Sequence, residues 1–271
     1  TEGRQFDDAM GRLNAADADV MALRIDRLRD IAWCLRAEIL ANIAKVRDLM
    51  NGVEAPPAVE AVAVFRNLNA VLNSIDRMEV RGRDSAGVSL LFVLAAAAYE
   101  RFAAALSQAG LQGEWERRCE RQPLLNQGIS VHRRDAAVAV GFTYKVAVEI
   151  GSLGDNIRCL RGHIAADAIL RTIVRFPLQF HTVNAHTRWA SVGAITEANC
   201  HPVDNRVVGN AAGESGIIHA CLNGDIDNFQ ELREALERDG RQIHAEVTTD
   251  TKIIPLQIEH YLRQGFEVTE A

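Results

Sequence analysis

The sequence predicts an α+β fold, with helices and strands intermixed along a chain of 271 residues. Three observations favour this class. Several segments carry apolar residues at helical spacing, and other segments are rich in β-branched residues or alternate as strands do. The strands and helices do not follow a βαβ rhythm, and the chain has no GxGxxG loop. The missing βαβ rhythm and the missing GxGxxG loop together argue against a Rossmann domain.

Two helices are predicted in the first third of the chain. The first covers residues 17–50 and is expected to end at Gly52, which suits a C′ position. Pro56-Pro57 then opens a second helix, with an apolar stripe from Val62 to Met78. The stripe of the first helix has two interpretations, a core face or a heptad-like dimer surface. The core face is favoured, because a helix with one apolar face usually buries it within its own domain.

The middle of the chain combines strands and helices. Strands are expected over residues 88–93, 129–132 and 136–148, which are rich in small and β-branched residues. Helices are expected over 95–109 and 156–174.

Two charged or alternating segments complete the middle of the chain. Residues 114–120 are charged and are predicted to be exposed. Residues 180–185 alternate as a strand does.

The last quarter begins with an apolar strand that ends in Asn223-Gly224, a dipeptide typical of hairpins. Asn228 and Glu231 form a capping-box pattern for a helix that ends near Gly240. A strand over 242–248 and a final helix over 251–263 follow. Pro255 is compatible with that helix only in its first turn or at a kink.

Composition excludes several classes of protein. Hydrophobic residues make up 48% and charged residues 24%, and the net charge is -6 with no long basic run, so nucleic-acid binding is not expected. No apolar segment approaches the length of a bilayer span, and the polar segment Thr1–Gln5 is not a signal peptide. The five cysteines form no CxxC pair and no zinc-site spacing, which indicates reduced thiols in a cytoplasmic protein without a metal or cofactor.

Four short strings carry the functional signal. They are VRGRDSAG at 80–87, HTRWASVG at 186–193, CLNG at 221–224 and TTDTK at 248–252. An arginine at the end of a strand, beside a hydroxyl and a glycine turn, is suited to bind a carboxylate in a bidentate manner.

In this order, the strings resemble the glutaminase domain of glutamine–fructose-6-phosphate aminotransferase (glucosamine-6-phosphate synthase), a class II glutamine amidotransferase. The family's strings are YRGYDSAG, HTRWATHG, HNG and ETDTE, and residues 197–202 also resemble its VNAHP. The matched segments cover about a third of the chain. The resemblance implies an N-terminal-nucleophile hydrolase fold, a four-layer αββα sandwich. Residues 1–271 would form this domain, with an added helix at 14–52 and an insertion at 91–134.

The resemblance implies a clamp for the head group of L-glutamine. Arg188 would hold the α-carboxylate with help from Ser191, and Asp250 would hold the α-ammonium. Each role has an alternative: Arg188 as a surface charge beside a core aromatic, Trp189, and Asp250 as the N-cap of the last helix.

The resemblance also implies the groups that hydrolyse glutamine to glutamate and ammonia. The Asn223 side chain and the Gly224 N–H would stabilise the oxyanion, and Arg81 would lie beside the nucleophile. The alternatives are a plain hairpin turn at Asn223-Gly224 and a structural ion pair between Arg81 and Asp84.

Other reactive side chains near these strings are given structural roles. Cys200 and Cys221 are expected to be buried thiols. His186 and His201 lack a matching ligand set and are taken as structural.

Two departures from the family affect the expected activity. Val192 replaces a histidine, and the family's N-terminal cysteine strand is absent. We therefore expect the nucleophile strand to precede Thr1 and a sugar isomerase domain, which would use the ammonia on a sugar phosphate, to follow Ala271. The rival interpretation is a non-catalytic glutamine sensor or a dimerisation scaffold on the same fold, and a homodimer is compatible with both.

Overall fold

The structure is a computed structural model that describes residues 14–51, 53, 57–120, 123–147, 152–209 and 216–269. It confirms the α+β class. The chain divides into two compact units, Thr1–Asp48 and Leu49–Ala271, which are described separately below. The predicted C′ residue Gly52 and the N-terminal segment lie outside the described residues.

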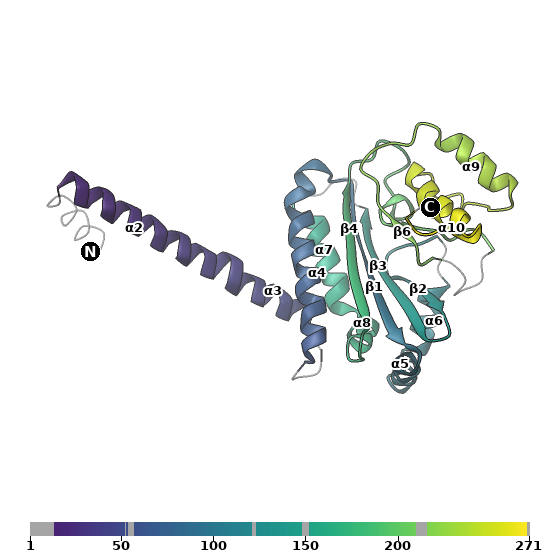
Figure 1. Cartoon of the computed structure of the whole chain (residues 1–271), viewed down its shortest axis with the longest axis horizontal. Helices are drawn as coiled ribbons and strands as arrows, with labels where there is room; N and C mark the ends of the chain where they lie inside the picture. The colour runs from purple at the N-terminus through teal and green to yellow at the C-terminus, as the bar shows by residue number, and fades with distance from the viewer. Residues whose placement is uncertain are drawn as a thin grey trace. The chain divides into compact units, whose positions relative to one another are not determined.

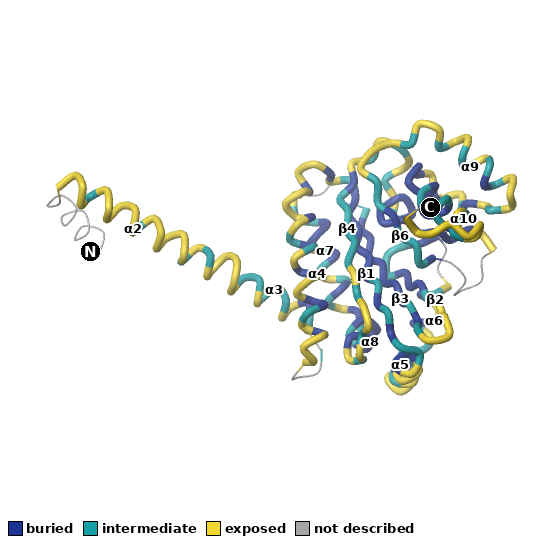
Figure 2. Tube along the Cα trace, in the orientation of Figure 1, coloured by how far each residue is buried: buried dark blue, intermediate teal, exposed yellow. Residues whose placement is uncertain are grey.

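The smaller unit contains the predicted first helix. Its segments are α2 (Ala15–Trp33), a π-helix η1 (Cys34–Leu40) and α3 (Ala41–Leu49). Asn14 caps α2 by accepting the Asp17 N–H at 3.0 Å. No residue of α2 or η1 is buried (Figure 2), so the favoured expectation of a core face is not met within this unit.

The larger unit is built on a four-stranded antiparallel sheet. Its strands are β1 (Ser85–Ala95), β2 (Gly128–Arg133), β3 (Ala137–Ala147) and β4 (Phe180–Arg188), in the order β2-β3-β1-β4 (Figure 1). All four strands were expected from the sequence. Within the described residues, β4 is an edge strand.

The two faces of this sheet differ in chemistry. The even-numbered residues of β1 from Ala86 to Leu94 are buried and apolar, and the sheet packs on that side against α4 (Val59–Met78) and α7 (Asp155–Ala166). On the other face, the first half of β1 carries the small and polar residues Ser85, Gly87 and Ser89. A Cβ at Gly87 would overlap the carbonyl oxygen of His201, so this glycine lets the next layer approach closely.

That next layer is mostly loop. It holds η3 (Glu197–Asn199) and the two-stranded sheet of β5 (Val203–Asp204) and β6 (His219–Ala220). The helices α9 (Phe229–Arg238) and α10 (Ile253–Arg263) pack on each other, and α10 contacts both β5 and β6. The layers therefore follow the order α, β, β, α, with a second sheet much smaller than expected.

Two predictions in this region are wrong. No strand forms over 242–248, because the N–H groups of Thr248 and Thr249 are bound by the Asn199 side chain at 2.7 and 3.0 Å. Asn223-Gly224 is a bend rather than a hairpin turn, since β6 pairs with the preceding β5. Asn228 does start α9, but its side chain makes no capping hydrogen bond.

The remaining helices are α5 (Ala96–Gln108), α6 (Gln112–Cys119) and α8 (Ala168–Ile173). The single helix predicted over 156–174 breaks at Asp167, whose carboxylate caps α8. The prediction that 114–120 is exposed is also wrong, because Trp115 and Arg118 of α6 are buried. Among the described helices, none has the length and apolar character that crossing a membrane requires.

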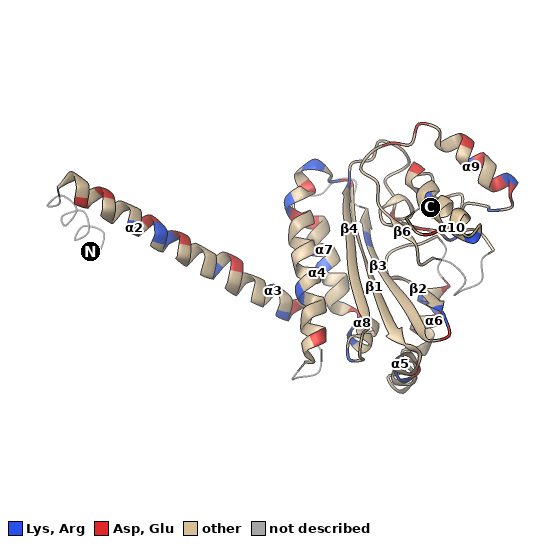
Figure 3. Cartoon of the chain, in the orientation of Figure 1, with Lys and Arg blue, Asp and Glu red and all other residues tan. Residues whose placement is uncertain are grey.

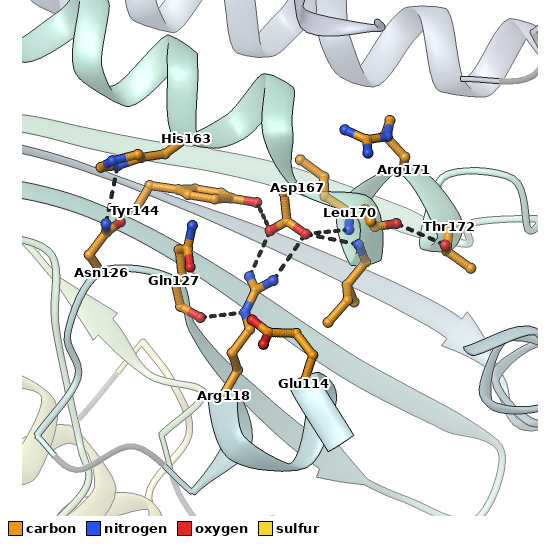
Figure 4. Close-up of polar contacts among 12 residues, drawn as sticks. Glu114, Arg118, Asn126, Gln127, Tyr144, His163, Asp167, Leu170, Arg171 and Thr172 are labelled. Carbon is orange, nitrogen blue, oxygen red and sulfur yellow. Dashed lines mark hydrogen bonds and ion pairs between the residues drawn. The ribbon is translucent and has the colours of Figure 1, made fainter. Parts of the chain in front are cut away.

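A buried ion pair explains both of these differences (Figure 4). Arg118 donates two hydrogen bonds to Asp167, at 3.0 and 2.7 Å, and the Tyr144 hydroxyl donates a third at 2.6 Å. Asp167 also accepts the N–H groups of Ile169 and Leu170. The carboxylate is thus satisfied from three elements, α6, β3 and α8, which fixes α6 to the sheet.

Candidate functional site

A cavity of about 390 Å³ lies beside the C-terminal end of β4. All six residues that the sequence assigned to the site line it, and they come from four separate chain segments. The cavity is lined by Ile75, Met78, Arg81, Ala185, His186, Thr187, Arg188, Trp189, Ser191, Val192, His201, Leu222, Asn223, Gly224, Asp225, Thr249, Asp250 and Thr251.

Gly82 brings Arg81 to this cavity. A Cβ at Gly82 would lie 2.9 Å from the Arg188 carbonyl carbon, so only glycine fits between η2 (Glu79–Arg81) and β4. Asp84 secures the contact, since its N–H donates to the Arg188 carbonyl and its carboxylate accepts the Ala190 N–H at 2.8 Å. Gly82 is extended rather than in a tight turn, and the Asp84 carboxylate binds a backbone N–H here.

Arg188 is buried, and Trp189 is 73% exposed, which is the reverse of the alternative in which Arg188 was a surface charge and Trp189 a core aromatic. The Arg188 guanidinium donates to the carbonyl of Ala194 at 3.3 Å and to the carbonyl of Val192. Burial lowers the pKa of Arg188, while Cys200, Asp250 and Asp84 oppose the shift. An arginine remains protonated at neutral pH, so the cavity wall carries a fixed positive charge with N–H groups left for a ligand.

Asp250 is buried and connects two loops of the site. Its carboxylate accepts the N–H of Ile226 and the N–H of Thr251, both at 2.8 Å. It is the first residue of η4 (Asp250–Lys252), whose N-cap is Thr249, and the last helix α10 has its N-cap at Lys252, so the cap alternative is wrong. Asp250 instead holds the loop that follows β6 against the start of α10.

The predicted oxyanion donors and Ser191 lie on the exposed side of the cavity. Asn223 and Gly224 line it from the bend after β6. The Ser191 hydroxyl donates to Asp225 at 2.5 Å, so Ser191 is engaged with a second cavity carboxylate. Sequence reasoning gave Asp225 no role, although it directly follows Gly224.

His186 and His201 also line the cavity. Their rings are in contact, tilted by 44° with centroids 4.7 Å apart. Burial is the main cause that lowers the pKa of both, and the neighbouring His186 ring helps lower that of His201 to about 3. Both rings are therefore neutral at pH 7. The sequence contains a signal for the position of His186. Residues two apart on a strand share a face, and Arg188 follows His186 by two residues on β4.

The thiols of the larger unit are not activated. Burial raises the pKa of Cys159 and Cys200, and raises that of Cys119 and Cys221 to about 12. None of these four cysteines lines the cavity. In addition, no group of three or more His, Cys, Asp or Glu side chains in the described ranges is arranged to hold a metal ion.

Comparison with known proteins gives one consistent name. The chain is 39% identical over 105 residues to glutamine–fructose-6-phosphate aminotransferase (isomerizing) of Gluconobacter oxydans, covering 39% of this chain and 15% of that protein. It is 31% identical over 131 residues to the enzyme of the same name from Sulfurisphaera tokodaii, covering 48% of this chain and 20% of that protein. No family model and no solved structure matches the chain.

These matches span at most a fifth of the length of the two relatives. Their names nevertheless agree with the resemblance found in the four sequence strings. The similarity supports a relationship to the glutamine–fructose-6-phosphate aminotransferase family over part of the chain.

Proposed function

We propose that the cavity binds L-glutamine and that the chain is the glutaminase part of a glutamine amidotransferase. The reaction would hydrolyse glutamine to glutamate and ammonia, with the ammonia passed to a sugar phosphate on a sugar isomerase domain of the same polypeptide. One observation carries this proposal: six residues from separate sequence strings, each assigned a role by resemblance, line one cavity.

The charges around the cavity suit the head group of an α-amino acid. Arg188 supplies a buried cation for the α-carboxylate, with Ser191 beside it, and Asp250 supplies a buried carboxylate for the α-ammonium. Asn223 and the Gly224 N–H would then bind the amide oxygen as negative charge develops on it. Arg81 would lie beside the nucleophile.

The nucleophile is part of the proposal as well. In the family it is a cysteine at the mature N-terminus, whose α-amino group acts as the base. The four thiols of the larger unit have raised pKa values and none of them lines the cavity, so they do not fit that role. We therefore propose that the cysteine lies upstream of Thr1. The layer order α, β, β, α supports an N-terminal-nucleophile hydrolase fold for the larger unit.

The test compares the present chain with a version extended by an N-terminal cysteine strand. We expect both to bind glutamine in calorimetry and only the extended version to release ammonia. A glutamine-like electrophile should label the added cysteine, as located by peptide mapping. Robust ammonia release by the present chain, or labelling of Thr1 or an internal cysteine, would contradict the proposed nucleophile.

Among the described residues no cysteine lines the cavity, which favours a second candidate, a non-catalytic glutamine sensor. The same experiment separates the two functions. Glutamine binding without ammonia release from either version supports the sensor, and no binding by either version contradicts both.

A further inference from the structure

The helix of the smaller unit exposes an unusual set of large aliphatic side chains. Those between 47% and 60% exposed include six that are spaced along the helix from residue 20 to residue 43. They are Val20, Leu23, Ile31, Leu35, Ile39 and Ile43, and are called the helix stripe below. A lone helix in water gains little stability from propensity, because most helical stability in proteins comes from packing an amphipathic face.

The π-helix keeps these residues aligned. Ile31, Leu35, Ile39 and Ile43 follow one another at intervals of four. Steps of four residues drift one way around an α-helix, which has 3.6 residues per turn, and the other way in the wider i→i+5 turn of a π-helix. The segment Cys34–Leu40 therefore offsets the drift and holds the four side chains on one face.

The charges of this helix match those of a reversed copy of itself. Residues 15–48 carry six acidic and six basic side chains, distributed along the helix in Figure 3. The first turns hold Asp17 and Asp19, and the last turns hold Lys45 and Arg47 together with one acid, Asp48. In an antiparallel pair, the acidic start of each copy lies beside the basic end of the other, so the favourable contact occurs at both ends of the pair. A parallel pair would place acid beside acid and base beside base.

We propose that the helix stripe binds a second copy of this chain as an antiparallel helix pair. Its two-fold axis passes near Ile31, so that Val20 and Leu23 of one copy pack against Ile39 and Ile43 of the other. An isologous contact of this kind is self-complementary, because the same face serves both copies. The balanced charge of the helix also makes a strongly acidic or basic partner a poor match.

The first test measures the oligomeric state of the full chain by sedimentation across a concentration series. The wild type should be dimeric, and Leu35→Glu with Ile39→Glu should weaken the dimer at least about a hundredfold, because it places four carboxylates in the contact. The matched control is Leu40→Glu, since Leu40 is 60% exposed but lies off the stripe. Cooperative unfolding in urea should show that the larger unit stays folded in all variants.

The second test determines whether the two helices run antiparallel or parallel. Replacing Asp17 and Asp19 by Lys should weaken the dimer at least tenfold, and adding Lys45→Asp with Arg47→Asp should restore it. In a parallel pair the first change would have little effect. A monomeric wild type, a dimer that survives the Leu35 and Ile39 changes, or a dimer that Leu40→Glu disrupts equally would overturn the proposal.

Discussion

At the scale of single residues, the cavity is organised by buried polar side chains that satisfy backbone groups. Asn199 binds the N–H groups of Thr248 and Thr249, and Asp250 binds those of Ile226 and Thr251. Buried polar groups that lose such partners are costly, so these contacts position the loops strongly. The loops around Asp250 are therefore held in place by contacts within the protein.

Asp250→Asn is expected to weaken glutamine binding. An amide oxygen can still accept one backbone N–H, but the charge that would hold the α-ammonium is lost, at a cost of about 1.5–3 kcal/mol. Titration calorimetry measures the effect. Asp227→Asn is the matched control, because Asp227 is an exposed neighbour that does not line the cavity. Equal affinity in Asp250→Asn and the wild type would leave Asp250 a structural residue.

Asn223→Ala is expected to lower turnover more than affinity in the version that carries the N-terminal cysteine. An oxyanion donor acts mainly in the transition state, and losing one typically costs on the order of 10²–10³ in rate. Steady-state ammonia release gives the turnover number, and calorimetry gives the affinity. Asn228→Ala provides the control, since Asn228 is exposed and makes no capping bond. A loss of affinity at constant turnover would reassign Asn223 to ground-state binding.

At the scale of elements, the buried pair of Arg118 and Asp167 decides how α6 and α8 are placed. Both side chains are at most 3% exposed. Burial acts to raise the pKa of Asp167, but its contacts with Arg118 and Tyr144 outweigh burial and lower it overall. The carboxylate therefore stays charged in the folded protein, and α6 is an integral part of the larger unit although it falls within the predicted insertion at 91–134.

Arg118→Ala is expected to destabilise the larger unit by about 3–5 kcal/mol, because it leaves a buried carboxylate without its cation. Urea unfolding followed by circular dichroism measures this change. Arg117→Ala is the control, since the neighbouring Arg117 pairs with Glu114 at the surface and such pairs contribute about 0–1 kcal/mol. Similar losses in both variants would mean that Arg118 contributes through helix packing alone.

At the scale of the whole molecule, buried histidines make stability depend on pH. The pKa of His201 is about 3 in the folded protein, against 6.5 for an ordinary histidine. The unfolded chain therefore binds a proton that the folded chain does not, and stability is lost as pH falls from about 6.5 toward 3. At pH 4, the loss from His201 is about 3 kcal/mol.

His201→Gln should flatten this dependence. The free energy of unfolding, measured in urea at several pH values between 7 and 4, should fall less steeply in the variant than in the wild type. An unchanged slope in His201→Gln would mean that His201 is protonated in the folded state within this range.

The sequence by itself predicted the α+β class, the four strands of the large sheet and most helices, because periodic apolar patterns are local properties of the chain. It also singled out six residues that line one cavity, since each occurs in a short string whose order resembles one family, and their roles stay predictions. These predictions needed no knowledge of how distant segments meet.

Only the tertiary structure decided the features that depend on partners remote in the chain. The Asn199 side chain binds the N–H groups of Thr248 and Thr249, so the strand predicted over 242–248 does not form. β6 pairs with β5, which precedes it, and not with a strand after Asn223-Gly224. Arg118 is buried because Asp167, 49 residues away, offers it a carboxylate. Local sequence could not predict these outcomes, because the free energy of a buried polar group depends on whether another segment brings its hydrogen-bond partner.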